Sequence, residues 1–253
     1  MAATFNADHL RASLQPLACA QPLSEEARAY QRFYGLDFAQ RTLRRGLGCF
    51  EVDGYEVVSQ LWWPERAKAT LFLFHGFYDH TGLYRHVIEW ALDQGFAVIA
   101  CDLPGHGLSS GARASIRDFS EYQDALQALF AEAHSIALPQ PWHLCGQSTG
   151  GAIVVDHVLN HGESSPAQGQ VILLSPLVRP RAWGWSQLSY YLLRPFVKGI
   201  ARRFSENSND PAWMANPAQP LRWRCARCAP LSPARALPCL WQTGCAAVFR
   251  PCG

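Results

Sequence analysis

A glycine-flanked serine is the part of this 253-residue sequence best suited to carry out chemistry. Residues 146–150 read Gly-Gln-Ser-Thr-Gly and stand between two apolar runs. This spacing is typical of a serine on a sharp strand-to-helix turn, where glycines such as Gly146 and Gly150 allow two stretches of backbone to pass closely. The pattern predicts that Ser148 is the nucleophile of an acyl-transfer reaction.

A nucleophile of this kind needs donors for the negative charge that develops on the attacked carbonyl oxygen. In a strand-turn-helix frame, one backbone donor follows the nucleophile and another lies in a loop after an earlier strand. The apolar run 70–74 leads into such a loop, which begins His75-Gly76-Phe77. We therefore predict that the N–H groups of Phe77 and Thr149 form an oxyanion hole, and that His75 and Gly76 support the loop.

The serine also needs a histidine base and an acid, which come later in the chain in this type of fold. After Ser148 the only histidines are His157 and His161, both expected in the helix that follows the turn. Beyond Asp210 there is no Asp, Glu or His, and His80, upstream, is expected to be an ordinary surface or loop histidine. Removing the base from such a triad costs on the order of a millionfold in turnover. The sequence therefore predicts serine-hydrolase chemistry that is impaired, with a non-catalytic lipid- or partner-binding protein as the alternative.

Short apolar runs alternate with helical patterns in the middle of the chain, which predicts buried parallel strands joined by crossover helices. In an open α/β sheet the carboxyl ends of such strands carry the catalytic groups. Ser120 followed by Gln123 resembles a capping box that starts one helix. The expected strands are 70–74, 96–101, 142–145 and 170–174, and the other expected helices are 83–94 and 151–159.

Two further patterns precede the parallel strands. The dipeptide Asp53-Gly54 joins two β-rich runs, 49–52 and 55–62, and predicts a tight antiparallel hairpin at the start of the sheet. A helical pattern begins at Ser24 and is expected to end at Gly35.

The composition excludes several classes of protein. Hydrophobic residues make up 49% and charged residues 17% of the chain, as in a globular domain, and a net charge of +2 gives no reason to expect nucleic-acid binding. Nine cysteines are an odd count for a fully disulfide-bonded secreted protein. The first residues lack a secretory pattern, and no apolar run reaches the roughly 20 residues that span a bilayer. We expect a cytoplasmic protein without a cofactor.

Four motifs then occur in an order typical of one group of enzymes. They are His75-Gly76 with Asp79-His80 and Tyr84, the string Asp-Leu-Pro-Gly-His-Gly-Leu-Ser at 102–109, residues 146–151, and Leu-Ser-Pro at 174–176. Together they resemble the monoacylglycerol lipase and lysophospholipase group of α/β-hydrolases, often grouped with serine aminopeptidase-like hydrolases, over about residues 45–210. The resemblance implies an α/β-hydrolase fold, architectural roles for Asp102 and His106, and cleavage of lipid esters through an acyl-enzyme on Ser148.

A segment rich in aromatic and basic residues follows the last expected strand, and no acidic residue lies between Arg179 and Arg203. Such a segment suits a helical cap over an apolar pocket, or an interfacial helix attracted to an anionic membrane. A core-packed helix with a solvated basic edge is the plain alternative. The expected organisation is a helical leader (1–42), an α/β core (43–178), a helical cap (179–210) and an atypical tail (211–253).

The tail differs sharply from the rest of the chain. It holds five arginines, five of the nine cysteines, seven of the 17 prolines and no acidic residue. One interpretation is a metal site on Cys225 and Cys228, but a second ligand pair is missing, so we predict no metal. Another is a binding module in a natural pseudoenzyme. We favour out-of-frame translation after Asp210, which predicts missing or aberrant C-terminal strands, an exposed sheet edge and poor stability; a Gly-Asp pair and a later histidine in another reading frame of the coding DNA would establish it.

Overall fold

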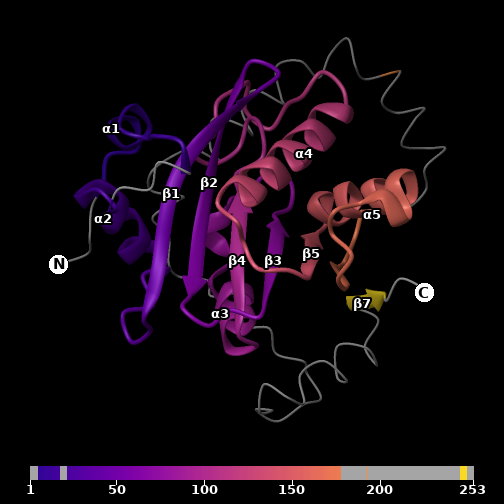
Figure 1. Ribbon diagram of the computed structural model, residues 1–253. Helices are drawn as coiled ribbons and strands as arrows, with labels where there is room; N and C mark the ends of the chain where they lie inside the picture. Colours follow the sequence, from indigo (N-terminus) through magenta and orange to yellow (C-terminus); the bar gives the residue numbers. More distant parts are fainter. Residues whose placement is uncertain (1–4, 18–21, 178–191, 193–245, 250–253) are drawn as a thin grey trace, which may run out of the picture.

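A mixed sheet forms the centre of the protein in the computed structural model, which describes residues 5–17, 22–177, 192 and 246–249. Its strands lie in the order β1-β2-β4-β3-β5-β6-β7. Strands β4, β3, β5 and β6 run parallel to one another, whereas β2 pairs antiparallel with both β1 and β4, and β7 pairs antiparallel with β6 (Figure 1). The strands are β1 (Leu43–Val52), β2 (Tyr55–Pro64), β3 (Ala69–Phe74), β4 (Phe96–Cys101), β5 (Trp142–Gln147), β6 (Val171–Leu174) and β7 (Ala246–Phe249).

The hairpin of β1 and β2 follows the predicted turn. Asp53 has a φ of 49° and Gly54 a φ of 77°, and positive φ at both positions is what a tight two-residue hairpin turn requires. Val52 pairs with Tyr55 across the turn, and the ladder continues to Leu43 and Pro64. The predicted hairpin is confirmed, with strands longer than the β-rich runs alone indicated.

Three crossover helices cover the two faces of the parallel strands, as the alternating pattern predicts. Helix α3 (Arg85–Asp93) packs on one face, and α4 (Ser120–Ser135) and α5 (Thr149–His161) pack on the other (Figure 1). Strand side chains alternate between the two cores, so Phe72 lies with α4 and α5 while Leu71 and Leu73 lie with α3. Every residue of β3 is buried, which explains its continuous apolar run.

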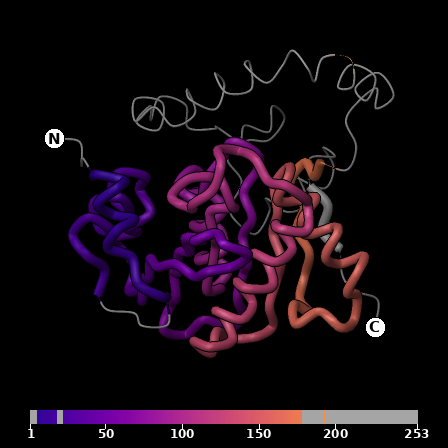
Figure 2. Tube along the Cα trace, turned by 90° about the horizontal axis from the view of Figure 1, so that it is seen from above, coloured from indigo at the N-terminus to yellow at the C-terminus, as the bar shows by residue number. Residues whose placement is uncertain are grey.

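The leader packs beside the edge of the sheet that β1 and β2 form. It contains α1 (Ala7–Ala12) and α2 (Glu25–Tyr34). In Figure 2 it lies at one end of the molecule, with the segment around α5 at the other. Helix α2 confirms the predicted boundaries, because Ser24 Oγ accepts from the N–H of Ala27 and Gly35 closes the helix at a φ of 66°. The side chain of Arg11 donates to the carbonyl oxygens of Gly107 and Leu108, both at 3.0 Å. Short 3-10 turns also occur at η2 (Thr81–Leu83) and η3 (Gly162–Ser164).

The predicted capping box at the start of α4 is wrong. Ser120 is the first helical residue, and its own N–H donates to the Asp118 carboxylate at 2.9 Å. The side chain of Gln123, expected to reach back toward the cap, instead donates to the Ile153 carbonyl of α5 at 2.9 Å. Asp118 lies two residues upstream of Ser120 and supplies the side-chain acceptor, which leaves the Ser-x-x-Gln spacing without a capping role.

The tail is predicted to give missing or aberrant C-terminal strands and an exposed sheet edge, and the exposed edge is wrong where the tail supplies one short strand. Strand β7 pairs antiparallel with β6, from Leu174 opposite Ala246 to Val171 opposite Phe249. Residues 246–249 are uncharged and apolar, so they are able to enter a sheet despite the composition around them. The edge of β6 is therefore paired over these four positions.

Several expectations fall outside the described residues. They include the cap at 179–210, apart from the single residue 192, and the cysteine pair of the proposed metal site. Among the residues that can be described, no group of His, Cys, Asp and Glu is arranged to hold a metal ion. In the same part of the chain, no helix combines the length and apolarity that crossing a membrane needs. The boundaries of the four segments stay predictions.

Candidate active site

Ser148 occupies a strained bend between β5 and α5. Its φ of 50° and ψ of −110° are unusual for a residue with a side chain, and such strain persists where the surrounding structure enforces it. Three backbone hydrogen bonds fix the bend. Ser148 N–H donates to the Leu174 carbonyl at 3.0 Å, and its own carbonyl accepts from Ala152 at 3.0 Å and from Leu177 at 2.9 Å. The side chain is therefore presented at the carboxyl end of the sheet, partly exposed.

Glycine is required on both sides of the bend. A Cβ placed on Gly146 would lie 2.3 Å from the carbonyl oxygen of Gly150, and a Cβ on Gly150 would lie 2.2 Å from the carbonyl oxygen of Phe74. A Cβ on Gly151 would meet Pro176 at 2.8 Å. These approaches bring the start of α5 against β5, against the end of β3, and against the residues after β6, so the bend is held on three sides.

The loop after β3 lies beside this bend, because β3 and β5 are neighbours that end at the same edge with Phe74 opposite Gly146. Phe77 follows in this loop, is 43% exposed, and precedes Tyr78 at a φ of 64°. Neither the N–H of Phe77 nor that of Thr149 donates a backbone hydrogen bond to another described residue. Both N–H groups are thus free to donate a hydrogen bond, and they follow the neighbouring strands β3 and β5.

His75 holds the loop through both ring nitrogens. Nε2 accepts from the N–H of Leu103 at 2.8 Å, so Nδ1 carries the ring proton and donates to the Gly76 carbonyl at 2.7 Å. Burial, followed by the neighbouring His106, lowers the pKa of His75 to about 3. The ring is neutral at physiological pH and serves as a fixed brace between the end of β3 and the turn after β4.

The turn after β4 is organised by Asp102, which is 1% exposed. Its carboxylate accepts from the N–H groups of Thr81 and Leu108, each at 2.8 Å, and its backbone carbonyl accepts from Ser109 Oγ at 2.6 Å. In the same turn, His106 donates from Nδ1 to the Pro104 carbonyl at 2.9 Å. These contacts join the turn to the loop after β3.

A hydroxyl group joins that loop to the serine bend. Tyr84 Oη accepts from the N–H of Gly76 at 2.9 Å and lies 2.9 Å from both Asp79 Oδ2 and Gln147 Oε1. A Cβ on Gly76 would collide with the Gln147 side chain, so the two segments are in direct contact. Gln147 has no signal of its own in the sequence, since it fills a variable position of the glycine-serine string. Burial, followed by the charge of Asp79, raises the pKa of Tyr84 well above its ordinary value, and the hydroxyl keeps its proton.

The variant Tyr84→Phe is expected to lower the free energy of unfolding by about 1–3 kcal/mol, because it leaves the Gly76 N–H and two side-chain oxygens without their shared partner. Denaturant unfolding measures the change. Tyr78→Phe is the matched control, since Tyr78 is exposed in the same loop. A Tyr84→Phe protein as stable as the unaltered chain would contradict the proposed bridging role.

The structure brings no described histidine to Ser148 Oγ. His157 and His161 lie in α5, as predicted, and a rise of about 1.5 Å per residue puts His157 about 13 Å along the helix from Ser148. His157 is fully buried, and both of its ring nitrogens are hydrogen-bonded: Nε2 lies 2.7 Å from Ser165 Oγ and Nδ1 lies 3.3 Å from Gln127 Nε2. Its burial lowers its pKa to about 4. His80, expected at the surface or in a loop, lies in the loop after β3 but is buried beneath Tyr34.

Comparison with known proteins places these features in a family. Residues 65–222, more than half of the chain, match the family described as serine aminopeptidase, S33. The chain is 34% identical over 115 residues to the phospholipase YtpA of Bacillus subtilis, covering 46% of this chain and 43% of that protein. It is 32% identical over 125 residues to a monoacylglycerol lipase of Mycolicibacterium smegmatis, covering 49% of this chain and 43% of that protein.

The solved structures that are similar include a soluble variant of the monoglyceride lipase of Saccharomyces cerevisiae. It shows 17% identity and a TM-score of 0.49, and the match covers 63% of this chain and 52% of that one. The chain thus spans less than half the length of the two curated relatives above. It belongs to the serine aminopeptidase S33 family of α/β-hydrolases, in the monoacylglycerol lipase and lysophospholipase group.

Proposed function

We propose that this protein is a serine esterase that acts on carboxylic esters of lipids through an acyl-enzyme on Ser148. One observation carries the proposal. Ser148 has a strained backbone conformation at the bend, and the N–H groups of Phe77 and Thr149, after β3 and β5, donate no backbone hydrogen bond to a described residue. In the reaction, Ser148 Oγ attacks the ester carbonyl carbon while its proton passes to a base. The two N–H groups stabilise the negative charge on the carbonyl oxygen, and loss of one such donor costs about 100- to 1000-fold in rate.

The acyl-enzyme forms when the carbonyl double bond is restored and the alcohol leaves with a proton. Water then attacks the acyl group, and the fatty acid leaves as Ser148 Oγ regains its proton. Gly146 and Gly150 allow the bend, and His75 and Gly76 hold the loop that carries Phe77. These steps use Ser148, the two amides, the substrate, a general base and water, so the proposal includes no cofactor and no metal.

Lipid esters are the proposed substrate class because two relatives are named as a phospholipase and a monoacylglycerol lipase. Within that class we propose monoacylglycerols or lysophospholipids. The arginine-rich, aromatic segment 179–203 supports peripheral contact with an anionic membrane. We further propose a cytoplasmic location, supported by the buried free thiols of Cys101 and Cys145, because free cysteines are usual in a reducing compartment.

A fluorophosphonate probe, which reacts with activated serines, tests the nucleophile. We expect labelling of the full chain that Ser148→Ala abolishes. Ser175→Ala is the matched control, because Ser175 is an exposed serine with a φ of 46° at the end of the adjacent strand, and its loss should leave labelling intact. Labelling that persists in Ser148→Ala would assign the reactive group elsewhere.

One observation favours a second function. Residues 211–253 contain no Asp, Glu or His, and no described histidine is bonded to Ser148 Oγ, so the general base is not supplied by the described residues. We therefore propose that this chain turns over esters slowly, and the alternative is a non-catalytic lipid- or partner-binding protein. An unlabelled, folded chain that still binds a non-hydrolysable monoacylglycerol ether would support the binding function over catalysis.

A further inference from the structure

The two N–H groups of the proposed oxyanion hole have a feature in common. Each belongs to a peptide group whose carbonyl oxygen accepts two hydrogen bonds. The Phe77 N–H shares its peptide group with the Gly76 carbonyl. The Thr149 N–H shares its peptide group with the Ser148 carbonyl. A peptide N–H becomes a stronger donor when the carbonyl of the same group is hydrogen-bonded, because bonds in a chain polarise one another.

At the Ser148 carbonyl both partners are backbone amides. The N–H of Ala152 donates at 3.0 Å as part of α5, and the N–H of Leu177 donates at 2.9 Å from the segment after β6. The first bond is the ordinary bond of a helix, whereas the second comes from a distant part of the chain. The peptide group of the Thr149 N–H is therefore fixed and polarised by the backbone alone.

At the Gly76 carbonyl one of the two partners is a side chain. The N–H of Asp79 donates at 3.1 Å and closes the loop, and Nδ1 of His75 donates at 2.7 Å. The imidazole makes the shorter bond, and its ring is 1% exposed. A hydrogen bond is electrostatically stronger in such surroundings than in water. Among the described residues, His75 is the only one whose side chain is bonded to the peptide group of the Phe77 N–H.

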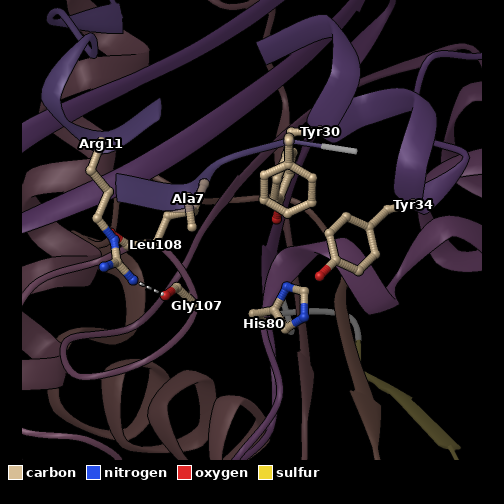
Figure 3. Close-up of a pocket in the computed structure, with 8 residues that line it drawn as sticks. Ala7, Arg11, Tyr30, Tyr34, His80, Gly107 and Leu108 are labelled. Atoms are coloured by element: carbon tan, nitrogen blue, oxygen red, sulfur yellow. Dashed lines mark hydrogen bonds between the residues drawn. The ribbon is translucent and has the colours of Figure 1, made fainter. Parts of the chain in front are cut away.

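The ring of His75 extends this chain of hydrogen bonds to the turn after β4. Its Nε2 accepts from the N–H of Leu103 at 2.8 Å. The leader holds the same turn, because the Arg11 side chain donates to the Gly107 carbonyl at 3.0 Å (Figure 3). Burial lowers the pKa of His75 to about 3, so the neutral ring has one N–H to give and one nitrogen that accepts. A continuous chain therefore runs from Leu103 through the imidazole to the Gly76 carbonyl.

We propose that His75 is a positioning residue that strengthens the Phe77 N–H as an oxyanion donor. The inference rests on the proposed function and adds an electrostatic role to the bracing of the loop. When Ser148 Oγ attacks the ester, negative charge grows on the carbonyl oxygen of the substrate and pulls on the Phe77 N–H. The bond from Nδ1 to the Gly76 carbonyl lets that peptide group polarise further. The ring keeps its proton on Nδ1 throughout, so no proton transfer through His75 is involved.

The size of the effect follows from two general magnitudes. One oxyanion donor is worth about 100- to 1000-fold in rate. A neighbouring bond in a chain strengthens a hydrogen bond by roughly 10–30%. The same share of the logarithm of the rate makes the contribution of His75 about 2- to 8-fold.

Two amide variants of His75 separate the bond to Gly76 from the brace to Leu103. In His75→Asn the amide nitrogen corresponds to Nδ1, so the variant keeps the donor for Gly76 and loses the acceptor for Leu103. In His75→Gln the amide oxygen corresponds to Nε2, so the variant keeps the acceptor and loses the donor. We expect the rate constant for fluorophosphonate labelling of Ser148 to fall about 2- to 8-fold in His75→Gln and to be largely restored in His75→Asn.

Tyr84→Phe is the matched control for a loosened loop. Tyr84 Oη accepts from the Gly76 N–H, which belongs to the preceding peptide group, so this variant leaves the carbonyl beside the Phe77 N–H untouched. Circular dichroism and the melting temperature establish that each variant is folded at the temperature of labelling. Labelling rates that simply follow the melting temperatures of the three variants would make His75 a brace only and would overturn the inference.

A second readout uses the unaltered chain and needs no variant. The phosphonyl oxygen of labelled Ser148 takes the place of the oxyanion, so the bond from Phe77 should strengthen the whole chain of hydrogen bonds. We expect the NMR resonance of the His75 Nδ1 proton to move downfield on labelling. An unmoved resonance on a labelled chain would overturn the inference and leave the proposed function standing. A chain that is not labelled at Ser148 would overturn the proposed function, and the inference with it.

Discussion

The free energy of unfolding is expected to fall steeply as the pH drops from about 6.5 toward 3, with unfolding above pH 4. The main cause is His75, whose pKa is lowered from 6.5 to about 3 by burial and by the neighbouring His106. Between these two values the unfolded chain binds a proton that the folded chain does not, so stability is lost at about 1.4 kcal/mol per pH unit. Over this window His75 alone accounts for about 5 kcal/mol, comparable to the whole stability of many domains.

Other buried histidines act in the same direction. Burial lowers the pKa of His80, His106 and His143, and it lowers the pKa of His157 to about 4. Above about pH 6.5 these rings are neutral in both states and contribute no pH dependence. Denaturant titrations at pH values from 7.5 to 4 measure the slope, and NMR of the His75 ring should show the neutral form for as long as the chain stays folded.

The exposed His86 provides the control. His86→Asn is expected to leave the pH slope unchanged, because the His86 side chain is exposed and is not one of the buried rings. A free energy of unfolding that stays level between pH 6.5 and 4 would contradict the proposed burial of neutral histidines.

Substituting Gly150 by alanine is expected to destabilise the protein by about 3 kcal/mol or more. The added Cβ would lie 2.2 Å from the carbonyl oxygen of Phe74 and 2.6 Å from that of His75, and neither backbone atom is free to move. Gly150 lies in the first turn of α5, where alanine would otherwise stabilise the helix by up to about 1 kcal/mol. The sign of the change therefore separates steric collision from helix propensity.

Gly162→Ala is the matched control for this substitution. Gly162 follows the other end of α5 with a φ of 47°, and nothing lies within 4 Å of the added Cβ. Only backbone strain of about 1–2 kcal/mol is expected there. Denaturant unfolding of both variants gives the comparison, and a Gly150→Ala protein at least as stable as Gly162→Ala would show that the bend is not closed as described.

Local patterns predicted most of the sheet because they depend on neighbours in the sequence. The dipeptide Asp53-Gly54 fixed the hairpin, and four continuous apolar runs located β3 to β6 to within about two residues. Helix α1 was not predicted, although Asn6 gave a usable signal: its side chain accepts from the N–H groups of Asp8 and His9. Strand β7 was missed because four apolar residues carry little weight within a tail of unusual composition.

Contacts between distant residues explain what the sequence did not reveal at the site. Gln147 contacts Tyr84 across 63 positions, and no local pattern marks it as part of the loop. His80 is buried because α2 covers it, and its loop sequence alone indicates exposure. The spacing around Ser148 located the bend correctly, whereas the availability of the Phe77 amide depends on β3 and β5 being neighbours in space.

The contact of Arg11 with Gly107 and Leu108 has a consequence for biosynthesis. These partners lie 96 and 97 positions downstream, so α1 leaves the ribosome several seconds before either carbonyl has been made. Until then Arg11 lacks both acceptors and the buried cluster around Leu10 lacks Leu108, and closing so long a loop delays this last contact. The leader is therefore among the last parts of the described fold to settle, and a nascent chain stalled before residue 107 would expose it to chaperones and proteases.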